Sequence, residues 1–231
     1  MKELKGLWKI LWLDIRRSYS IFWSILLFFV ILGIGISISF PQGEVSWNMD
    51  GAVLIYQIVI GAMLFRIAFD YGSTFGSTRK LMYVGVVSFL FILSLVSAFL
   101  LNALYFLLQP LLSVLDVNME LNSLLHMSTI SENFFGYLLI LFTIYVFSST
   151  VSMLLSILKQ QVGAIALYGT AGIFALTVIL PAVNTYWVDL FYWFSRAPLL
   201  NMFLWILLVS VVLLCIPVPF VRQFQIFSDK K

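Results

Sequence analysis

The stretch DYGSTFGSTRKLMY, residues 70–83, decides how the rest of the chain is interpreted. It is short and polar, contains two glycines and the pair Arg79 and Lys80, and lies between two segments hydrophobic enough to cross a bilayer. Short loops rich in Lys and Arg stay on the cytoplasmic side of a membrane. We therefore expect residues 70–83 to face the cytoplasm, and a docking element for a cytosolic partner is one interpretation of them.

The composition places the chain in a membrane. Of its 231 residues 62% are hydrophobic and 10% are charged, and the mean hydropathy is +1.07. A soluble protein carries about 25% charged residues, so this chain has too few to cover a surface in water. The net charge of +3 is too small to indicate a nucleic-acid partner, and one cysteine, Cys215, with one histidine, His126, excludes a disulfide framework and a Cys/His metal site.

The first 18 residues, MKELKGLWKILWLDIRRS, predict an amphipathic helix. At 100° per residue, one arc holds the apolar residues Leu4, Leu7, Trp8, Leu11, Trp12 and Ile15. A basic stripe beside that arc holds Lys2, Lys5, Lys9 and Arg16. Tryptophans on one face and cations on the other are typical of a helix that lies in the interface of an anionic leaflet. The alternative, the start of a signal peptide, lacks a small-residue cleavage site after the next apolar run.

Six apolar stretches follow, each reaching the roughly 20 residues that cross a bilayer. We expect spans at about 21–40, 51–69, 82–108, 134–158, 162–183 and 199–221. The predicted fold class is thus an all-α membrane protein, one transmembrane domain over 1–231, with six transmembrane helices preceded by the interfacial helix.

The loops predict the orientation. Lys and Arg residues gather before the first span, in the second loop, in the fourth loop (Lys159) and in the tail, whereas the intervening loops contain Glu44, Asp50, Asp116, Glu120, Glu132 and Asp189 against one cation, Arg196. Short loops rich in Lys and Arg stay inside, so we expect both termini in the cytoplasm of a multi-pass protein of the cell membrane.

Two outer stretches carry alternatives. Residues 109–133 mix apolar with polar residues, and a helix lying on the outer surface is one interpretation. The aromatic stretch 184–198 fits the headgroup belt, but a segment that dips part-way into the membrane and returns fits equally well.

The small residues of the fifth span allow close helix contacts, either inside the bundle or with a second subunit.

The spans contain few residues that carry chemistry, so we do not expect an enzyme. Arg66 and Asp70 are spaced for an ion pair that anchors the cytoplasmic end of the second span. Gln57 and Asn102 lie deeper, and we expect each to hydrogen-bond a neighbouring helix. No phosphate-binding G-x-x-x-x-G-K-[ST] loop is present, so this chain does not bind and hydrolyse a nucleotide by itself.

A resemblance gives the 70–83 stretch a role that the residues alone leave open, since Arg-Lys before a span is also the ordinary mark of a cytoplasmic loop. The interfacial helix, six spans with both ends inside, and the motif F-G-S-T-R-K-x-x-Y-x-G after span two resemble the permease subunit of a bacterial ABC-2-type exporter. The resemblance implies a coupling helix, seated in a groove of a separate ATPase subunit and formed by Phe75, Gly76, Ser77, Thr78, Arg79, Lys80 and Tyr83.

The same resemblance implies further parts. The interfacial helix, with Lys5, Trp8, Lys9, Trp12 and Arg16, is similar to the family's connecting helix. Trp187, Phe191 and Trp193 lie where the family has short re-entrant helices near its outer gate. ATP and Mg would bind the partner subunit, and this chain would bind no cofactor. A second permease, either identical or a sister chain, would complete a transport path.

The function that the resemblance implies is ATP-driven export of a hydrophobic or amphipathic cargo, such as an antimicrobial or other membrane-active peptide, by alternating access. The alternative is a stand-alone membrane scaffold or channel that has no ATPase partner. The sequence determines neither the cargo nor the choice between a homodimer and a heterodimer.

Overall fold

The computed structural model describes residues 2–40, 45–74, 78–114, 119–121, 134–163, 169, 189 and 199–215. These residues form five helices and two three-residue strands. The helices are α1 (Lys2–Ser39), α2 (Met49–Thr74), α3 (Arg79–Val114), α4 (Phe134–Val162) and α7 (Leu199–Cys215), and the strands are β1 (Val45–Trp47) and β2 (Met119–Leu121). The expected fifth span, the tail and the gate residues Trp187, Phe191 and Trp193 lie almost wholly outside the described residues.

Four of the helices are long and apolar enough to cross a membrane. They are Leu4–Ser39 of α1, Met49–Tyr71 of α2, Arg79–Val114 of α3 and Phe134–Gln161 of α4. Each covers one of the first four expected spans, except that the first helix stops at Ser39 and leaves out Phe40. The part of α7 that is described has 17 residues and begins where the expected sixth span begins. The chain is therefore largely helical and carries the apolar helices of a membrane-embedded protein.

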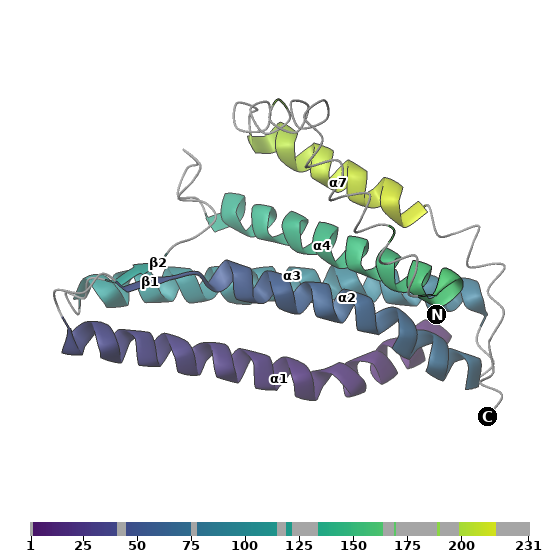
Figure 1. The fold of residues 1–231 in the computed structure, drawn as a ribbon, viewed down its shortest axis with the longest axis horizontal. Helices are drawn as coiled ribbons and strands as arrows, with labels where there is room; N and C mark the ends of the chain where they lie inside the picture. The colour runs from purple at the N-terminus through teal and green to yellow at the C-terminus, as the bar shows by residue number, and fades with distance from the viewer. Residues whose placement is uncertain are drawn as a thin grey trace.

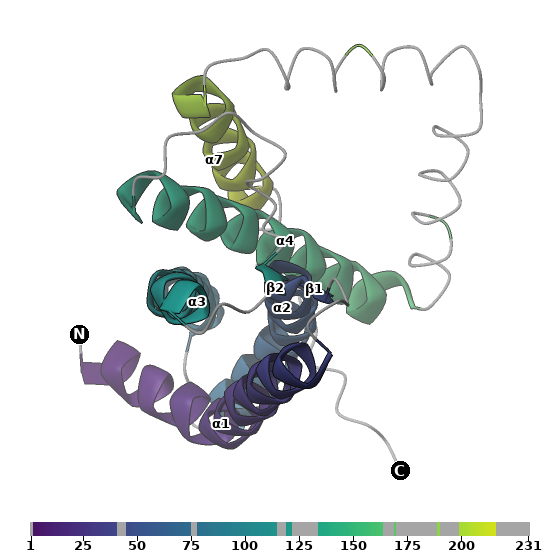
Figure 2. The same ribbon diagram turned by 90° about the vertical axis from the view of Figure 1, so that its left-hand side faces the viewer.

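The first helix differs from the expectation of a separate interfacial helix over 1–18. α1 continues without a break from Lys2 to Ser39, because no Gly or Pro interrupts the sequence where the two segments meet. At 1.5 Å per residue, its 38 residues extend about 57 Å, well beyond roughly 30 Å of hydrocarbon. Figure 2 shows that α1 bends part-way along its length.

One face of α1 is buried along nearly the whole helix. Its buried apolar residues, mostly three or four positions apart, are Leu7, Leu11, Ile15, Tyr19, Leu26 and Val30. The first four belong to a core cluster shared with α2, α3 and α4, and the last two to a second cluster shared with the same three helices. The apolar arc expected to enter lipid therefore lies largely against the bundle, while Trp12 stays exposed.

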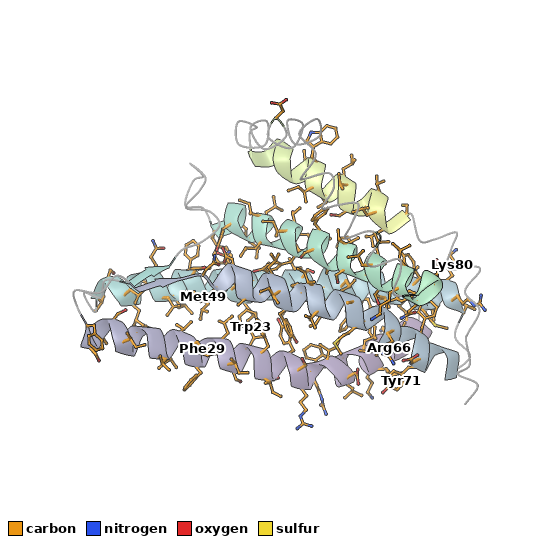
Figure 3. All side chains as sticks on the ribbon, in the orientation of Figure 1. Trp23, Phe29, Met49, Arg66, Tyr71 and Lys80 are labelled. Carbon is orange, nitrogen blue, oxygen red and sulfur yellow. The ribbon has the colours of Figure 1, made fainter. Side chains whose placement is uncertain are left out.

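The helices are arranged in layers. α2 and α3 lie between α1 on one side and α4 on the other, and α7 packs on α4 (Figures 1 and 2). The N-terminus of α1, the end of α2, the start of α3 and the end of α4 lie toward one end of the bundle (Figure 1). We call this end the basic end and the other the opposite end. Figure 3 shows Arg66, Tyr71 and Lys80 toward the basic end.

Small residues bring α2 and α4 close together. A methyl group added at Gly61 would overlap the backbone carbonyl oxygen of Ser149 and would come within 2.6 Å of Ser152 Oγ. Two serines of α4 donate across this contact, Ser152 to the carbonyl of Ile58 at 2.5 Å and Ser156 to the carbonyl of Ala62 at 2.8 Å. Lipid tails are as apolar as the side chains, so the hydrophobic effect does not drive helices together in a bilayer. Close packing and hydrogen bonds between helices hold them together instead.

The connections at the opposite end meet in a small sheet. β1 pairs parallel with β2, with Val45 opposite Met119 and Trp47 opposite Leu121. For the described part of 109–133 this corrects the interpretation as a surface helix, because residues 109–114 belong to α3, which runs past Pro110, and 119–121 are a strand. Residues 115–118 and 122–133 lie outside the described residues. Ser113 donates to the carbonyl of Pro110 at 2.7 Å in the last turn of α3.

Candidate functional site

The junction between α2 and α3 is the stretch singled out from the sequence. α2 ends at Thr74 and α3 begins at Arg79, and Phe75, Gly76 and Ser77 lie outside the described residues. The backbone carbonyl of Thr78 accepts the amide of Met82 at 3.0 Å. Thr78 is therefore the N-cap residue of α3. Thr78 and Lys80 are exposed and Arg79 is half-buried.

Tyr83, the last residue of the expected coupling set, lies inside the bundle. Its side chain is buried, and its hydroxyl donates to the carbonyl oxygen of Leu214 at 2.5 Å. This bond joins the second turn of α3 to the last described turn of α7. The structure thus separates Tyr83 from the exposed Thr78 and Lys80.

The N-terminal half of α1 is attached to the same part of α3. Trp8 donates its indole N–H to Ser88 Oγ at 3.1 Å. Leu7 packs directly on Gly85, where an added methyl group would overlap it. The basic residues Lys5, Lys9 and Arg16 are exposed. The predicted connecting helix therefore presents its cations outward while its apolar face holds α3.

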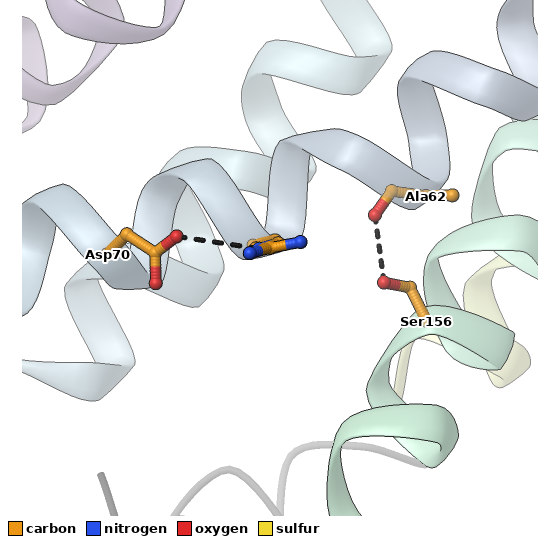
Figure 4. A network of polar contacts seen from close by, with 4 residues as sticks. Ala62, Asp70 and Ser156 are labelled. Atoms are coloured by element: carbon orange, nitrogen blue, oxygen red, sulfur yellow. Dashed lines mark hydrogen bonds and ion pairs between the residues drawn. The ribbon is translucent and has the colours of Figure 1, made fainter. Parts of the chain in front are cut away.

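The described Lys and Arg residues are distributed unevenly over the bundle. They lie in the N-terminal half of α1, in the second half of α2, in the first turn of α3 and in the last turn of α4. The expected pair of Arg66 and Asp70 forms, with Arg66 Nε and Asp70 Oδ2 3.7 Å apart (Figure 4). Because these side chains are 77% and 70% exposed, the pair contributes at most about 1 kcal/mol.

A second polar site lies inside the opposite end, and sequence reasoning missed it. Asp50 was counted among the outer loop acids, but it lies in the first turn of α2 and is fully buried. The hydroxyl of Tyr137, from α4, is 3.1 Å from its Oδ1 and 3.3 Å from its Oδ2. The ring of Tyr105, from α3, packs edge-on against Tyr137 with centroids 5.5 Å apart.

The signal that could have found this site is the position of the acid. Asp50 directly precedes the apolar run 51–69, and a carboxylate in the first turn of a helix is stabilised by the helix dipole. An ionisable group buried in a membrane protein is expensive to place there, and such residues usually serve a function.

Of the two deeper amides, Asn102 behaves as expected. Its Nδ2 donates to the carbonyl of Phe134 on α4 at 2.9 Å. Gln57 is fully buried, but neither its Nε2 nor its Oε1 has a hydrogen-bond partner among the residues that the structure describes. Within the described parts of the chain, no group of three or more His, Cys, Asp or Glu residues is close enough to hold a metal ion.

Comparisons of this chain with protein families, with curated proteins and with solved structures give no match.

Proposed function

We propose that this chain is the membrane-spanning subunit of an ATP-driven exporter of the ABC-2 type, multi-pass in the cell membrane with both termini in the cytoplasm. ATP and Mg bind a separate cytosolic ATPase subunit. The cargo is hydrophobic or amphipathic, such as a membrane-active peptide. A second permease, identical or a sister chain, completes the path.

The observation that carries this proposal is the distribution of the cations. The described Lys and Arg residues lie in the N-terminal half of α1 or toward the basic ends of α2, α3 and α4, which supports a cytoplasmic basic end. The break between α2 and α3 lies at that end, and the motif that resembles the coupling helix spans it.

The contacts around the break support a mechanical role for it. α3 starts at the break, and within its first ten residues it holds α7 through Tyr83 and α1 through Ser88. A force applied to residues 75–80 would therefore reach three helices at once. Such a force requires that the ATPase bind two conformations of this chain with different affinity, because a partner with equal affinity for both shifts nothing.

The experiment is a pull-down of the full chain, extracted in a mild detergent from its native membranes. We expect it to retain a soluble subunit with a phosphate-binding loop, and we expect Phe75→Ala and Arg79→Ala to lose that subunit. Phe135→Ala and Arg17→Ala are the matched controls, since Phe135 is exposed at the opposite end and Arg17 is exposed on α1. Both controls should retain it.

The alternative, a stand-alone scaffold or channel, gives a different result. The wild-type chain would then retain no ATPase under gentle extraction, and Phe75→Ala would change nothing. Retention that survives both Phe75→Ala and Arg79→Ala would keep the ATPase partner but overturn the assignment of residues 75–80 as its docking element.

A further inference from the structure

The core of the bundle contains buried polar groups that have no hydrogen-bond partner in the described structure. They come from four helices: Trp23 Nε1 and Ser37 Oγ on α1; both amide atoms of Gln57 on α2; Ser94 Oγ, Asn102 Oδ1 and the Tyr105 hydroxyl on α3; and the Tyr145 hydroxyl on α4. The groups on α2, α3 and α4 carry the inference below. Gln57 and Tyr145 are 0% exposed. Buried polar groups are nearly always hydrogen-bonded to protein or to ordered water. This number of unpartnered groups in one core therefore requires an explanation.

On the side of α1, Gln57 lies beside a polar contact. Tyr56, its neighbour on α2, packs against Tyr19 of α1 with ring centroids 6.0 Å apart. The hydroxyl of Tyr19 is 3.1 Å from Ser97 Oγ of α3. Ser94 lies one turn before Ser97 on the same helix, and both serines are fully buried. Gln57 and Ser94 therefore lie at about the same height along the long axis of the bundle.

On the side of α4, Tyr145 joins this level to Asp50. α2 and α4 run parallel, with Asp50 bonded to Tyr137 and Ile58 bonded to Ser152. Gln57 thus lies opposite the α4 segment between those two contacts, which contains Tyr145. Tyr145 belongs to the same buried cluster as Tyr137, whose hydroxyl bonds Asp50. The unpartnered groups form a column that leads from Asp50 toward the middle of the bundle.

The chemistry of the column selects its occupant. Gln57 presents a donor and an acceptor, the tyrosine and serine hydroxyls can do both, and Asn102 Oδ1 only accepts. A cation would satisfy the acceptors but not the amide N–H groups, and an anion would do the reverse. Water donates and accepts, and buried water typically makes about three hydrogen bonds to such groups.

We propose that the column of Gln57, Ser94, Asn102, Tyr105 and Tyr145 is an internal water-binding site that Asp50 and Tyr137 close at the opposite end. It makes the middle of an otherwise apolar bundle hydrated. This inference does not depend on the exporter proposal, because it uses no residue of the basic end.

The first test is radiolytic hydroxyl-radical labelling of the full chain in detergent, read by mass spectrometry. Radicals formed from bound water modify the side chains beside it, even where those side chains are closed to bulk solvent. We expect Tyr145 to be modified several-fold faster than Phe65, an equally buried aromatic residue of the apolar first cluster. Tyr83, whose hydroxyl is bonded to Leu214, serves as a tyrosine control. Equal rates for Tyr145 and Phe65 would overturn the proposal.

The second test is the sign of a stability change. In a hydrated column Gln57→Leu removes hydrogen bonds to water, and we expect the midpoint of thermal unfolding to fall by about 2–4 °C. In a dry column the same substitution removes buried groups without partners, so the midpoint would rise, which would contradict the proposal. Leu64→Met, a volume-conserving change at another fully buried position of α2, gives the effect of repacking alone.

Discussion

The hydroxyl of Tyr83 donates to the backbone carbonyl of Leu214, and this bond joins the start of α3 to the end of α7 across 131 positions of sequence. Replacing Tyr83 with Phe keeps the ring but removes the donor to the Leu214 carbonyl. We expect the free energy of unfolding to fall by about 1–2 kcal/mol, measured by thermal unfolding in detergent. Tyr71→Phe is the control, because Tyr71 is exposed and should leave stability within about 0.5 kcal/mol.

The contact between α2 and α4 predicts that even one added methyl group at Gly61 lowers the free energy of unfolding. Gly61→Ala places a methyl group against the Ser149 carbonyl oxygen, and the backbone must move to admit it. We expect a loss of about 1–3 kcal/mol in unfolding free energy. Gly35→Ala, where nothing lies within 4 Å of the added methyl group, should be neutral or slightly stabilising. Equal effects of the two substitutions would contradict the close approach of α2 and α4.

The bond between Asp50 and Tyr137 predicts an energetic coupling. We expect a double-mutant cycle with Asp50→Asn and Tyr137→Phe to give about 1–3 kcal/mol, measured by unfolding of the single and double variants. Thr143→Val is the reference for losing a buried hydroxyl, since the Thr143 hydroxyl donates to the carbonyl of Leu139 in its own helix. Strict additivity of the two substitutions would show that the two side chains do not interact.

The orientation can be tested with single cysteines. Cys215 is exposed and is not in a disulfide, so it is first replaced with Ser. We expect a membrane-impermeant maleimide to label Lys80→Cys only after cells are permeabilised. It should label Val114→Cys, 83% exposed at the other end of α3, in intact cells. The reverse pattern would place the basic end outside.

The pair of Arg66 and Asp70 predicts a small effect. Both side chains are exposed, so solvent screens the attraction, and we expect Asp70→Asn to change the unfolding free energy by less than about 1 kcal/mol. The change should shrink further in high salt. A loss of several kcal/mol would mean that Asp70 has a structural role beyond this pair.

Hydrophobicity was sufficient to find the helices. The expected spans at 51–69, 82–108 and 134–158 lie inside α2, α3 and α4. The expected span 134–158 and the observed α4 both start at Phe134. The observed helices extend past most of the expected ends, because helical hydrogen bonding continues into the polar residues that a hydropathy argument assigns to loops. Thr78, which precedes α3 and is not helical, lies in the connection expected between the second and third spans.

Contacts between distant residues were not predictable in the same way. Asp50 is an outer loop acid by its local sequence, and it becomes a core residue only because Tyr137, 87 positions away, supplies a hydroxyl. Tyr83 was assigned to a docking surface by its motif, and its burial depends on α7. The polar column likewise becomes visible only when α2, α3 and α4 are assembled.

The pairing of β1 with β2 has a mechanical consequence. β1 belongs to the connection between α1 and α2, and β2 to the connection between α3 and α4, so their hydrogen bonds tie the two helical hairpins together at the opposite end. While the strands stay paired, the hairpins share a pivot there. A rotation of one hairpin against the other therefore displaces the basic end most.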